Sequence, residues 1–220
     1  MKKIISLFLC LALGGSALTG CSQESAPFTQ AEYTADAAQI EEINIDVRDR
    51  QIEVSLSEDG KIHIIYFENS RETCDITVSD EKVLTMTDAG SKSWTDYIGG
   101  KPPAENRKIS LQIPDALLDA LALSTTNENI SIPSLAVTGS ISLSSNGGNI
   151  TFDSLDVGDT LHLTVKNGDI SGTIKGSYDD FAIQTEIKKG ESSLPDRKEG
   201  GEKTLQVSCN HGDVNVEFVK

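Results

Sequence analysis

Four side-chain oxygens recur at one place in a repeated turn. Asn129, Asn149, Asp169 and Asp213 each stand directly before an aligned Ile or Val, and glycine precedes three of them. Such a column of oxygens could bind calcium, as glycine- and aspartate-rich β-helix repeats do. Calcium prefers about six to eight oxygens, however. Glycine followed by Asn or Asp also suits a tight turn with positive φ. The sequence favours the turn over a metal site, and we expect no metal.

A second candidate for chemistry is Cys21, which follows an apolar leader. Residues 4–13 form an apolar run too short for a membrane-spanning helix, and two lysines precede it. Leu18-Thr19-Gly20 before the cysteine resembles a bacterial lipoprotein processing site, where the sulfur receives a diacylglyceryl group and the chain is cut. We expect residues 1–20 to be a signal peptide and Cys21 to be lipidated, which would anchor the protein to the membrane. The alternative is an ordinary secretory signal with a chance cysteine.

The residues that usually carry catalysis are not grouped. His63 and His162 each stand between two apolar residues, His211 lies in a turn, and none has the spacing of a zinc site. No serine has the surroundings of a nucleophile elbow. We therefore predict no enzyme activity and no cofactor. Because β-helices can cleave polysaccharides with two clustered carboxylates, a carbohydrate-active enzyme stays open as an alternative.

Trp94 and Tyr97 are the paired large aromatic residues of a loop that also contains Gly99-Gly100 and Pro102-Pro103. One interpretation is that they cover an end of a β structure, whose open edge would otherwise invite aggregation. The other is a small contact patch for a sugar or a protein. The sequence favours the interpretation that the two residues cover an end of the β structure.

The net charge and the composition of the chain restrict the possible binding partners. The 220-residue chain carries a formal charge of −15, and loss of Lys2 and Lys3 with the signal peptide would make it −17. Such a charge argues against nucleic acid as a partner. Of four cysteines, Cys74 and Cys209 would remain unmodified; both alternate with apolar residues, and we expect two free thiols far apart.

Period-two alternation of apolar residues begins at Ile43 and continues through most of the chain, which predicts half-buried β-strands. Glu58-Asp59-Gly60 predicts a tight turn that joins strands 51–57 and 61–67 into a hairpin. Residues 21–38 have no clear period and predict a lipid-anchored flexible tether. Residues 39–220 would then form a single all-β domain.

A fixed repeat occupies residues 109–220. Apolar-x-apolar segments begin at 121, 141, 161 and 181, and a last one begins at 205, four residues late. Nine residues after these starts come Ile130, Ile150, Ile170 and, in the last unit, Val214. A 20-residue unit cannot bury its own apolar face, but stacked units can. We therefore expect a stacked β-solenoid, similar to a parallel β-helix, after an N-terminal antiparallel strand region; a β-sandwich is the alternative.

At this point the sequence resembles a known family of bacterial β-strand-repeat surface proteins, regarded as candidate adhesins with a domain of unknown function. The resemblance rests on ISLQIP at 109–114, LLDALALS at 117–124, SKSWTDYI at 91–98 and the Asn/Gly-rich turns, and covers about residues 40–220. Gly190, where Ile is expected, and the charged segment 188–203 depart from it. The family implies a fold and a surface location, often as a lipoprotein, but brings no catalytic residues.

We therefore expect a non-enzymatic, membrane-anchored extracytoplasmic lipoprotein, an adhesin or an envelope scaffold. Its partners would be the membrane, through the lipid anchor, and an envelope protein or polysaccharide, but no nucleic acid. The chain would be a monomer. Two alternatives stay open: a β-helix-type carbohydrate-active enzyme, and a sensory partner in an envelope-stress system.

Overall fold

The alternating segments form two nine-stranded β-sheets, which we term sheet A and sheet B. A computed structural model describes residues 27–89, 103–115 and 118–220. In spatial order, the strands of sheet A are β1 (Thr29–Asp36), β4 (Lys61–Glu68), β7 (Lys108–Ile113), β3 (Gln51–Leu56), β9 (Ile130–Ile132), β12 (Ile150–Val157), β14 (Ile170–Lys175) and β18 (Val214–Val219), with β10 (Leu135–Val137) also paired to β12.

Sheet B faces sheet A across the apolar interior. Its strands, again in spatial order, are β16 (Arg197–Lys198), β15 (Phe181–Lys189), β17 (Lys203–His211), β13 (Thr160–Asn167), β11 (Ser140–Ser145), β8 (Ala120–Thr125), β2 (Glu42–Asp46), β6 (Val83–Asp88) and β5 (Cys74–Val78). Within the described ranges, short 3-10 helices accompany the strands: η1 (Ala37–Gln39), η3 (Ala104–Arg107) and η4 (Tyr178–Asp180).

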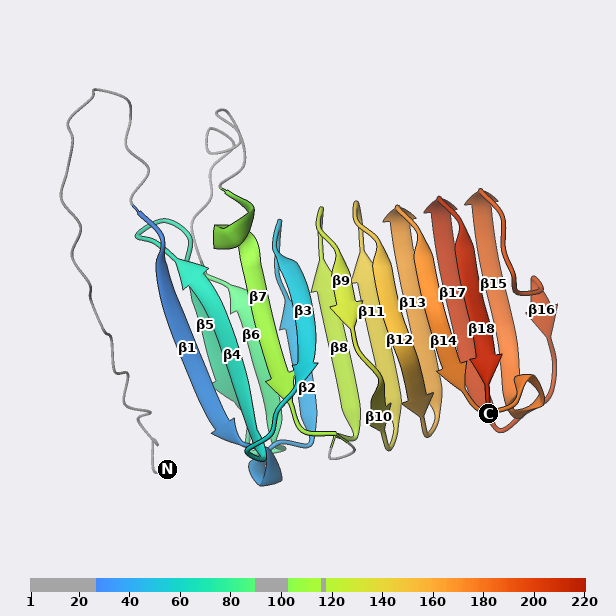
Figure 1. Ribbon diagram of the computed structural model, residues 1–220, viewed down its shortest axis with the longest axis horizontal. Helices are drawn as coiled ribbons and strands as arrows, with labels where there is room; N and C mark the ends of the chain where they lie inside the picture. Colours follow the sequence, from blue (N-terminus) through green and yellow to red (C-terminus); the bar gives the residue numbers. More distant parts are fainter. Residues whose placement is uncertain (1–26, 90–102, 116–117) are drawn as a thin grey trace.

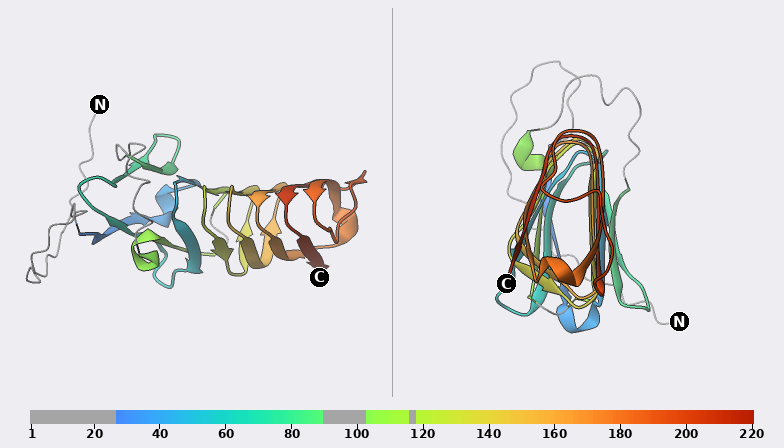
Figure 2. Two further views of the ribbon diagram at one scale, coloured as in Figure 1. Left: turned by 90° about the horizontal axis from the view of Figure 1, so that it is seen from above. Right: turned by 90° about the vertical axis from the view of Figure 1, so that its right-hand side faces the viewer.

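The strands stand side by side along the long axis of the molecule (Figure 1). Viewed from above, the two sheets form two layers, and viewed along the stack the coils superimpose in a narrow outline (Figure 2). The chain is therefore all-β and solenoid-like, with parallel pairs in the middle and antiparallel pairs near the N-terminal end.

The predicted 20-residue repeat sets the register of the central strands. Ile130, Ile150 and Ile170 are direct neighbours in sheet A, and Val214 continues their row. In sheet B the corresponding row contains Leu121, Ile141, Leu161 and Leu205. All eight side chains are buried. Because each apolar side chain stacks on a similar one about 4.8 Å away, every coil buries the face that it could not bury alone.

The order of the last two coils differs from the order in the sequence. β17 lies between β13 and β15, so the last coil stacks directly on the coil that begins at 161. Phe181 is opposite Lys203, and Ile183 rather than Phe181 is opposite Leu205. The predicted alignment of 181 with 205 was therefore wrong by two residues. The segment 188–203 is long enough to return the chain to the inner position, and part of it forms β16 against the outer edge of β15.

The predicted hairpin of residues 51–57 and 61–67 was also wrong. β3 and β4 run in opposite directions, and Gly60 has the positive φ of +71° that a turn requires, but β7 lies between the two strands. β7 pairs with β3 in parallel over six residues, from Gln51 opposite Lys108 to Leu56 opposite Ile113. A strand from later in the sequence thus takes the position that local pairing would have filled.

Residues 29–36 were predicted to belong to the flexible tether, and this was wrong. They form β1, which pairs antiparallel with all eight residues of β4. Ala31, Tyr33 and Ala35 pack against the core. These small and aromatic residues gave a weak alternating signal that the polar residues between them obscured. The folded region therefore begins at least by Thr29 and not at residue 39.

The two cysteines of the described residues are both free, Cys74 half-buried and Cys209 buried. They lie in β5 and β17, near opposite ends of sheet B, as the sequence predicted. In the part of the chain that the structure describes, no helix is long and apolar enough to cross a membrane.

Candidate functional site

The predicted oxygen column exists, and its oxygens accept backbone hydrogen bonds. Asn129 Oδ1 accepts from the N–H of Asn149 at 2.8 Å, and Asn149 Oδ1 accepts from the N–H of Asp169 at 2.9 Å. Asp169 Oδ1 accepts from Asp213 N–H, and Asp213 Oδ1 from Glu191 N–H, both at 2.9 Å. We term this series of side-chain-to-backbone bonds the corner ladder.

The corner ladder gives each of these four side chains a structural partner. Main-chain bonds at the same corner run from the N–H of Ile130 to Asn149 O and from Ile150 to Asp169 O, each 2.9 Å long. Within the described ranges, no group of three or more His, Cys, Asp or Glu side chains is arranged to hold a metal ion. The geometry supports the turn interpretation of the column.

The glycines that precede the ladder residues are required by contact between coils. A Cβ at Gly148 would lie 2.1 Å from the carbonyl oxygen of Glu128, and one at Gly212 would lie 2.0 Å from that of Gly168. Gly168 and Gly212 also have positive φ, whereas Gly148 does not. The turn explanation from the sequence was thus incomplete, because close backbone approach along the stack excludes a side chain even where φ permits one.

A buried arginine forms a cluster that the sequence analysis missed. Arg50 is only 2% exposed and lies at the corner between β2 and β3. Its Nη1 donates to Phe67 O at 2.7 Å, while Nη2 lies 3.7 Å from Glu72 Oε2 and Nε lies 3.5 Å from Asp88 Oδ1. A buried charge needs such partners. Arg50 therefore ties this corner to the ends of β4 and β6, and its position in a polar stretch gave no signal.

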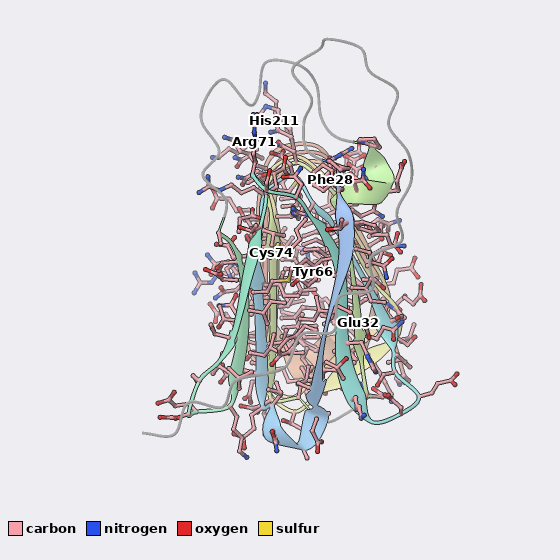
Figure 3. The ribbon with its side chains drawn as sticks, turned by 90° about the vertical axis from the view of Figure 1, so that its left-hand side faces the viewer. Phe28, Glu32, Tyr66, Arg71, Cys74 and His211 are labelled. Carbon is pink, nitrogen blue, oxygen red and sulfur yellow. The ribbon has the colours of Figure 1, made fainter. Side chains whose placement is uncertain are left out.

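Cys74 lies near this cluster, on the inner face of β5 (Figure 3). Burial raises the pKa of its thiol from 9.0 to about 11, and the nearby Arg50 opposes part of that rise. Burial also raises the pKa of Cys209. A raised pKa leaves both thiols protonated and poorly nucleophilic at neutral pH, which argues against a role for either as a catalytic nucleophile.

The three histidines lie apart from one another. His63 projects from the outer face of β4, with Nε2 3.0 Å from Asp59 Oδ2 and Nδ1 3.3 Å from Glu32 Oε1. The two carboxylates approach opposite nitrogens of the ring, so this arrangement joins β1 to the turn before β4 and does not form a shared metal site. His162 is exposed on sheet B, and His211 ends β17.

Cys21, Trp94 and Tyr97 lie outside the described residues, so the predicted lipidation and the predicted aromatic patch stay predictions. The structure does contain an aromatic cluster near the C-terminal end of the stack. Phe218 packs against Tyr178 and Phe181 with ring centroids 5.5 and 5.4 Å apart.

Beside the aromatic cluster, residues of β15, β16 and β17 line a hollow of about 100 Å³. Pockets that enclose a small ligand usually measure about 300–1,000 Å³. This hollow is therefore too small to enclose a sugar chain.

The central part of the outer face of sheet B carries few charges, whereas Lys166, Lys188 and Asp75 lie nearer its margins. Three directly paired rows cross the seven strands from β6 to β15. The middle row contains Thr85, Asn44, Ala122, Ser142, His162, Gln206 and Gln184. The row below it contains Val83, Glu42, Ala120, Ser140, Thr160, Thr204 and Ala182; the row above it contains Thr87, Asp46, Ser124, Ser144, Thr164, Ser208 and Glu186. Only Glu42, Asp46 and Glu186 are acidic, and no residue of these rows is Lys or Arg.

Comparison with known proteins agrees with this architecture. The family described as Toastrack DUF4097 matches residues 40–177, which is more than half of the chain. The chain belongs to the Toastrack DUF4097 family. This confirms the family resemblance found in the sequence. No curated protein matches this Toastrack chain.

Solved structures are similar to this chain at low sequence identity. A crystal structure from Clostridium sporogenes ATCC 15579, provisionally named a cell adhesion protein, is similar with a TM-score of 0.57 and 12% identity, covering 88% of this Toastrack chain and all of that chain. A provisionally named adhesin from Parabacteroides merdae ATCC 43184 has 18% identity and a TM-score of 0.34, with coverage of 88% and 96%. At 12% identity, the similarity to the Clostridium sporogenes structure establishes the fold alone.

Asn149→Ala should lower the free energy of unfolding by about 1–2 kcal/mol, because it leaves the N–H of Asp169 without its acceptor at a packed corner. Asn149→Asp keeps an acceptor oxygen and should lower the free energy of unfolding by less than Asn149→Ala does. Thr151→Ala, at an exposed position two residues later, is the control. Urea unfolding measures all three. Equal stability of Asn149→Ala and Thr151→Ala, or a rise of several degrees in Tm with calcium, would contradict a purely structural ladder.

Cys74 should make the protein less stable in alkali. Between pH 9 and about 11 the unfolded thiol ionises while the folded thiol stays protonated. The stabilising contribution is therefore fully present below pH 9 and is lost as the pH rises through this window; the loss is about 2 kcal/mol at pH 10.5 and roughly 3 kcal/mol in total. Cys74→Ala should remove this part of the decline, as measured by urea unfolding at pH 8 and pH 10.5. Identical pH dependence in the variant would refute the raised pKa.

Proposed function

We propose that this chain is a non-enzymatic surface protein, anchored to the outer side of a bacterial membrane, whose sheet B face contacts an envelope polymer. The observation that carries the proposal is the outer face of sheet B, where 21 paired positions hold three charges in a chain of net charge −15. Seven parallel strands at about 4.8 Å spacing give this face a length of roughly 29 Å.

The chemistry of the face suits a neutral polymer. Ser, Thr, Asn and Gln side chains donate and accept hydrogen bonds without the desolvation cost of a charge. Their short side chains leave the face flat, so a long chain could lie across many strands, whereas a small ligand would find little enclosure. Polysaccharide hydroxyl groups match this pattern, and a neutral protein surface is the second possibility.

Location is the second part of the proposal. The leader at residues 1–20 and Cys21 support export and a lipid anchor. The provisional name of the Clostridium sporogenes structure, a cell adhesion protein, agrees with a surface role. The rival function is cleavage of the bound polysaccharide, which needs two carboxylates at a defined separation.

Cys21→Ser should release the protein from the membrane. The full chain, expressed in a bacterium, should partition into the detergent phase of a phase-separating detergent, because acyl chains carry it there. The Cys21→Ser variant should stay in the aqueous phase, while Cys10→Ser, which alters a cysteine within the signal peptide, should behave as the wild type. Partition of Cys21→Ser into detergent would exclude this anchor.

Binding should depend on the sheet B face. Ser142→Glu with Ser144→Glu adds two carboxylates to its centre and should weaken binding to isolated bacterial cell-wall polysaccharide about tenfold or more. Thr151→Glu with Asn215→Glu adds the same charge to the outer face of sheet A and should leave binding unchanged. Both variants should unfold within about 0.5 kcal/mol of the wild type.

The same polysaccharide distinguishes binding from catalysis. We expect the full chain to bind it without release of reducing ends. Release that requires folded protein would establish the enzyme instead. Equal binding by the sheet A and sheet B variants would refute the sheet B face as the contact surface.

A further inference from the structure

Two Asn-Gly steps stand at successive corners of the stack. Asn146-Gly147 follows β11, and Asn167-Gly168 stands at the end of β13. In such a step the glycine nitrogen can attack the side-chain amide carbon of the asparagine, because glycine has no Cβ to crowd the attacking atom. The nitrogen must also be free to lose its proton and to turn toward the side chain. The hydrogen bonds of each step therefore determine whether it can react.

The Asn146-Gly147 step is free of such bonds. The N–H of Gly148 donates to Ser145 Oγ at 3.0 Å, which closes a turn around the two residues. The base of this turn is fixed, because Ser145 is fully buried and its Oγ donates to Glu128 O at 3.0 Å. Asn146 and Gly147 are both exposed. Within the described ranges, neither the N–H of Gly147 nor the side chain of Asn146 has a hydrogen-bond partner.

The Asn167-Gly168 step is held by two hydrogen bonds. Asn167 still belongs to β13, where it lies opposite His211. The N–H of Gly168 donates to His211 O at 2.9 Å, and Asn167 Nδ2 donates to Asn146 O at 3.2 Å. The attacking nitrogen and the leaving nitrogen are therefore both engaged, and ring closure at this step would break both bonds.

The asparagines of the corner ladder are protected in a similar way. Asn149 Oδ1 accepts from the N–H of Asp169 at 2.9 Å. The residue after Asn149 is the β-branched Ile150, and its N–H donates to Asp169 O at 2.9 Å. The nitrogen that would attack is again hydrogen-bonded, and its side chain crowds the approach.

We propose that Asn146 is a site of spontaneous covalent modification in the folded protein, by cyclisation and hydrolysis. The nitrogen of Gly147 bonds to Asn146 Cγ as the bond from Cγ to Nδ2 breaks, and the proton of the Gly147 N–H leaves with the side-chain NH₂ as ammonia. Water then opens the cyclic imide at one of its two carbonyl carbons. Opening at Cγ gives aspartate. Opening at the main-chain carbonyl gives isoaspartate, in which the chain continues through Cγ and the former carbonyl becomes a free carboxylate. Water is the only co-reactant.

The isoaspartate product alters the main chain where one coil contacts the next. Asn146 O accepts from the N–H of Asn167 at 3.1 Å and from its Nδ2 at 3.2 Å. In isoaspartate this oxygen belongs to a carboxylate outside the main chain, and an additional carbon enters a turn whose ends Ser145 and Gly148 hold together. We therefore expect the isoaspartate form to be less stable. The aspartate form keeps its main chain and gains only an exposed charge.

Incubation of the purified full chain at mildly alkaline pH tests the assignment. Trypsin separates the two steps, because it cuts between Lys166 and Asn167. Fragment mass spectra locate the mass gain of replacing NH₂ with OH, and enzymatic methylation of its carboxylate identifies isoaspartate. In the folded chain, Asn146 should react at least about tenfold faster than Asn167, whereas both should react at similar rates in the chain unfolded by urea.

Two variants separate the chemistry from its consequence. Gly147→Ala should slow the reaction about tenfold or more, because a Cβ crowds the attacking nitrogen. The nearest atom to that Cβ is a side-chain atom, Asn127 Oδ1, at 3.0 Å, so this variant should fold. Asn146→Asp carries the product charge on an unaltered main chain. It should unfold at the same urea concentration as fresh wild type, and the isoaspartate form should unfold at a lower one.

Three results would contradict the proposal. Equal rates at Asn146 and Asn167 in the folded chain would show that the hydrogen bonds at Gly168 give no protection. Reaction at Asn146 only after unfolding would show that the folded turn prevents the attack. An isoaspartate form as stable as Asn146→Asp would overturn the expected effect on the stack.

Discussion

The whole stack depends on how closely one coil can approach the next at the corner. The corner ladder satisfies the N–H of each successive Asn or Asp with the side-chain oxygen of the coil below. At the same point the backbone of one coil comes so close to the next that a Cβ at Gly148, Gly168 or Gly212 would lie within 2.5 Å of a carbonyl oxygen. Glycine and an acceptor side chain thus act together, since one permits the approach and the other pairs the amide that the approach buries.

Once the corner fixes the spacing, the apolar rows follow. Identical or similar residues stack in register, so every coil offers its neighbours the surface that they need, whatever their order in the sequence. This explains why β17 can lie between β13 and β15 and why β7 can lie between β3 and β4. Which strands become neighbours in a sheet depends on their register and their apolar pattern. Where the connection is long enough, a strand from later in the sequence can therefore lie between two earlier strands or inside the outermost coil.

The register of the strands was predicted correctly from the sequence wherever successive units were 20 residues long. Ile130, Ile150 and Ile170 stand 20 residues apart, so their alignment follows directly from the spacing. The predicted alignment failed where the connections between strands changed length, as at Phe181 and Leu205. The spacing alone does not reveal which of the last two coils is the outer one. β1 was missed because its inner face uses Ala31 and Ala35, which give little apolar signal. Arg50 was missed because a buried charge is recognisable only from partners far away in the sequence, such as Glu72 and Asp88.

We interpret the corner column as part of the fold and not as a ligand site. Amide hydrogen exchange, followed residue by residue by NMR, tests it most directly at Asn149, Asp169 and Asp213. All three residues have exposed side chains, yet the corner ladder predicts that their N–H groups exchange orders of magnitude more slowly than in an unstructured peptide, with or without calcium. Exchange at unprotected rates, or protection that appears only when calcium is added, would contradict it.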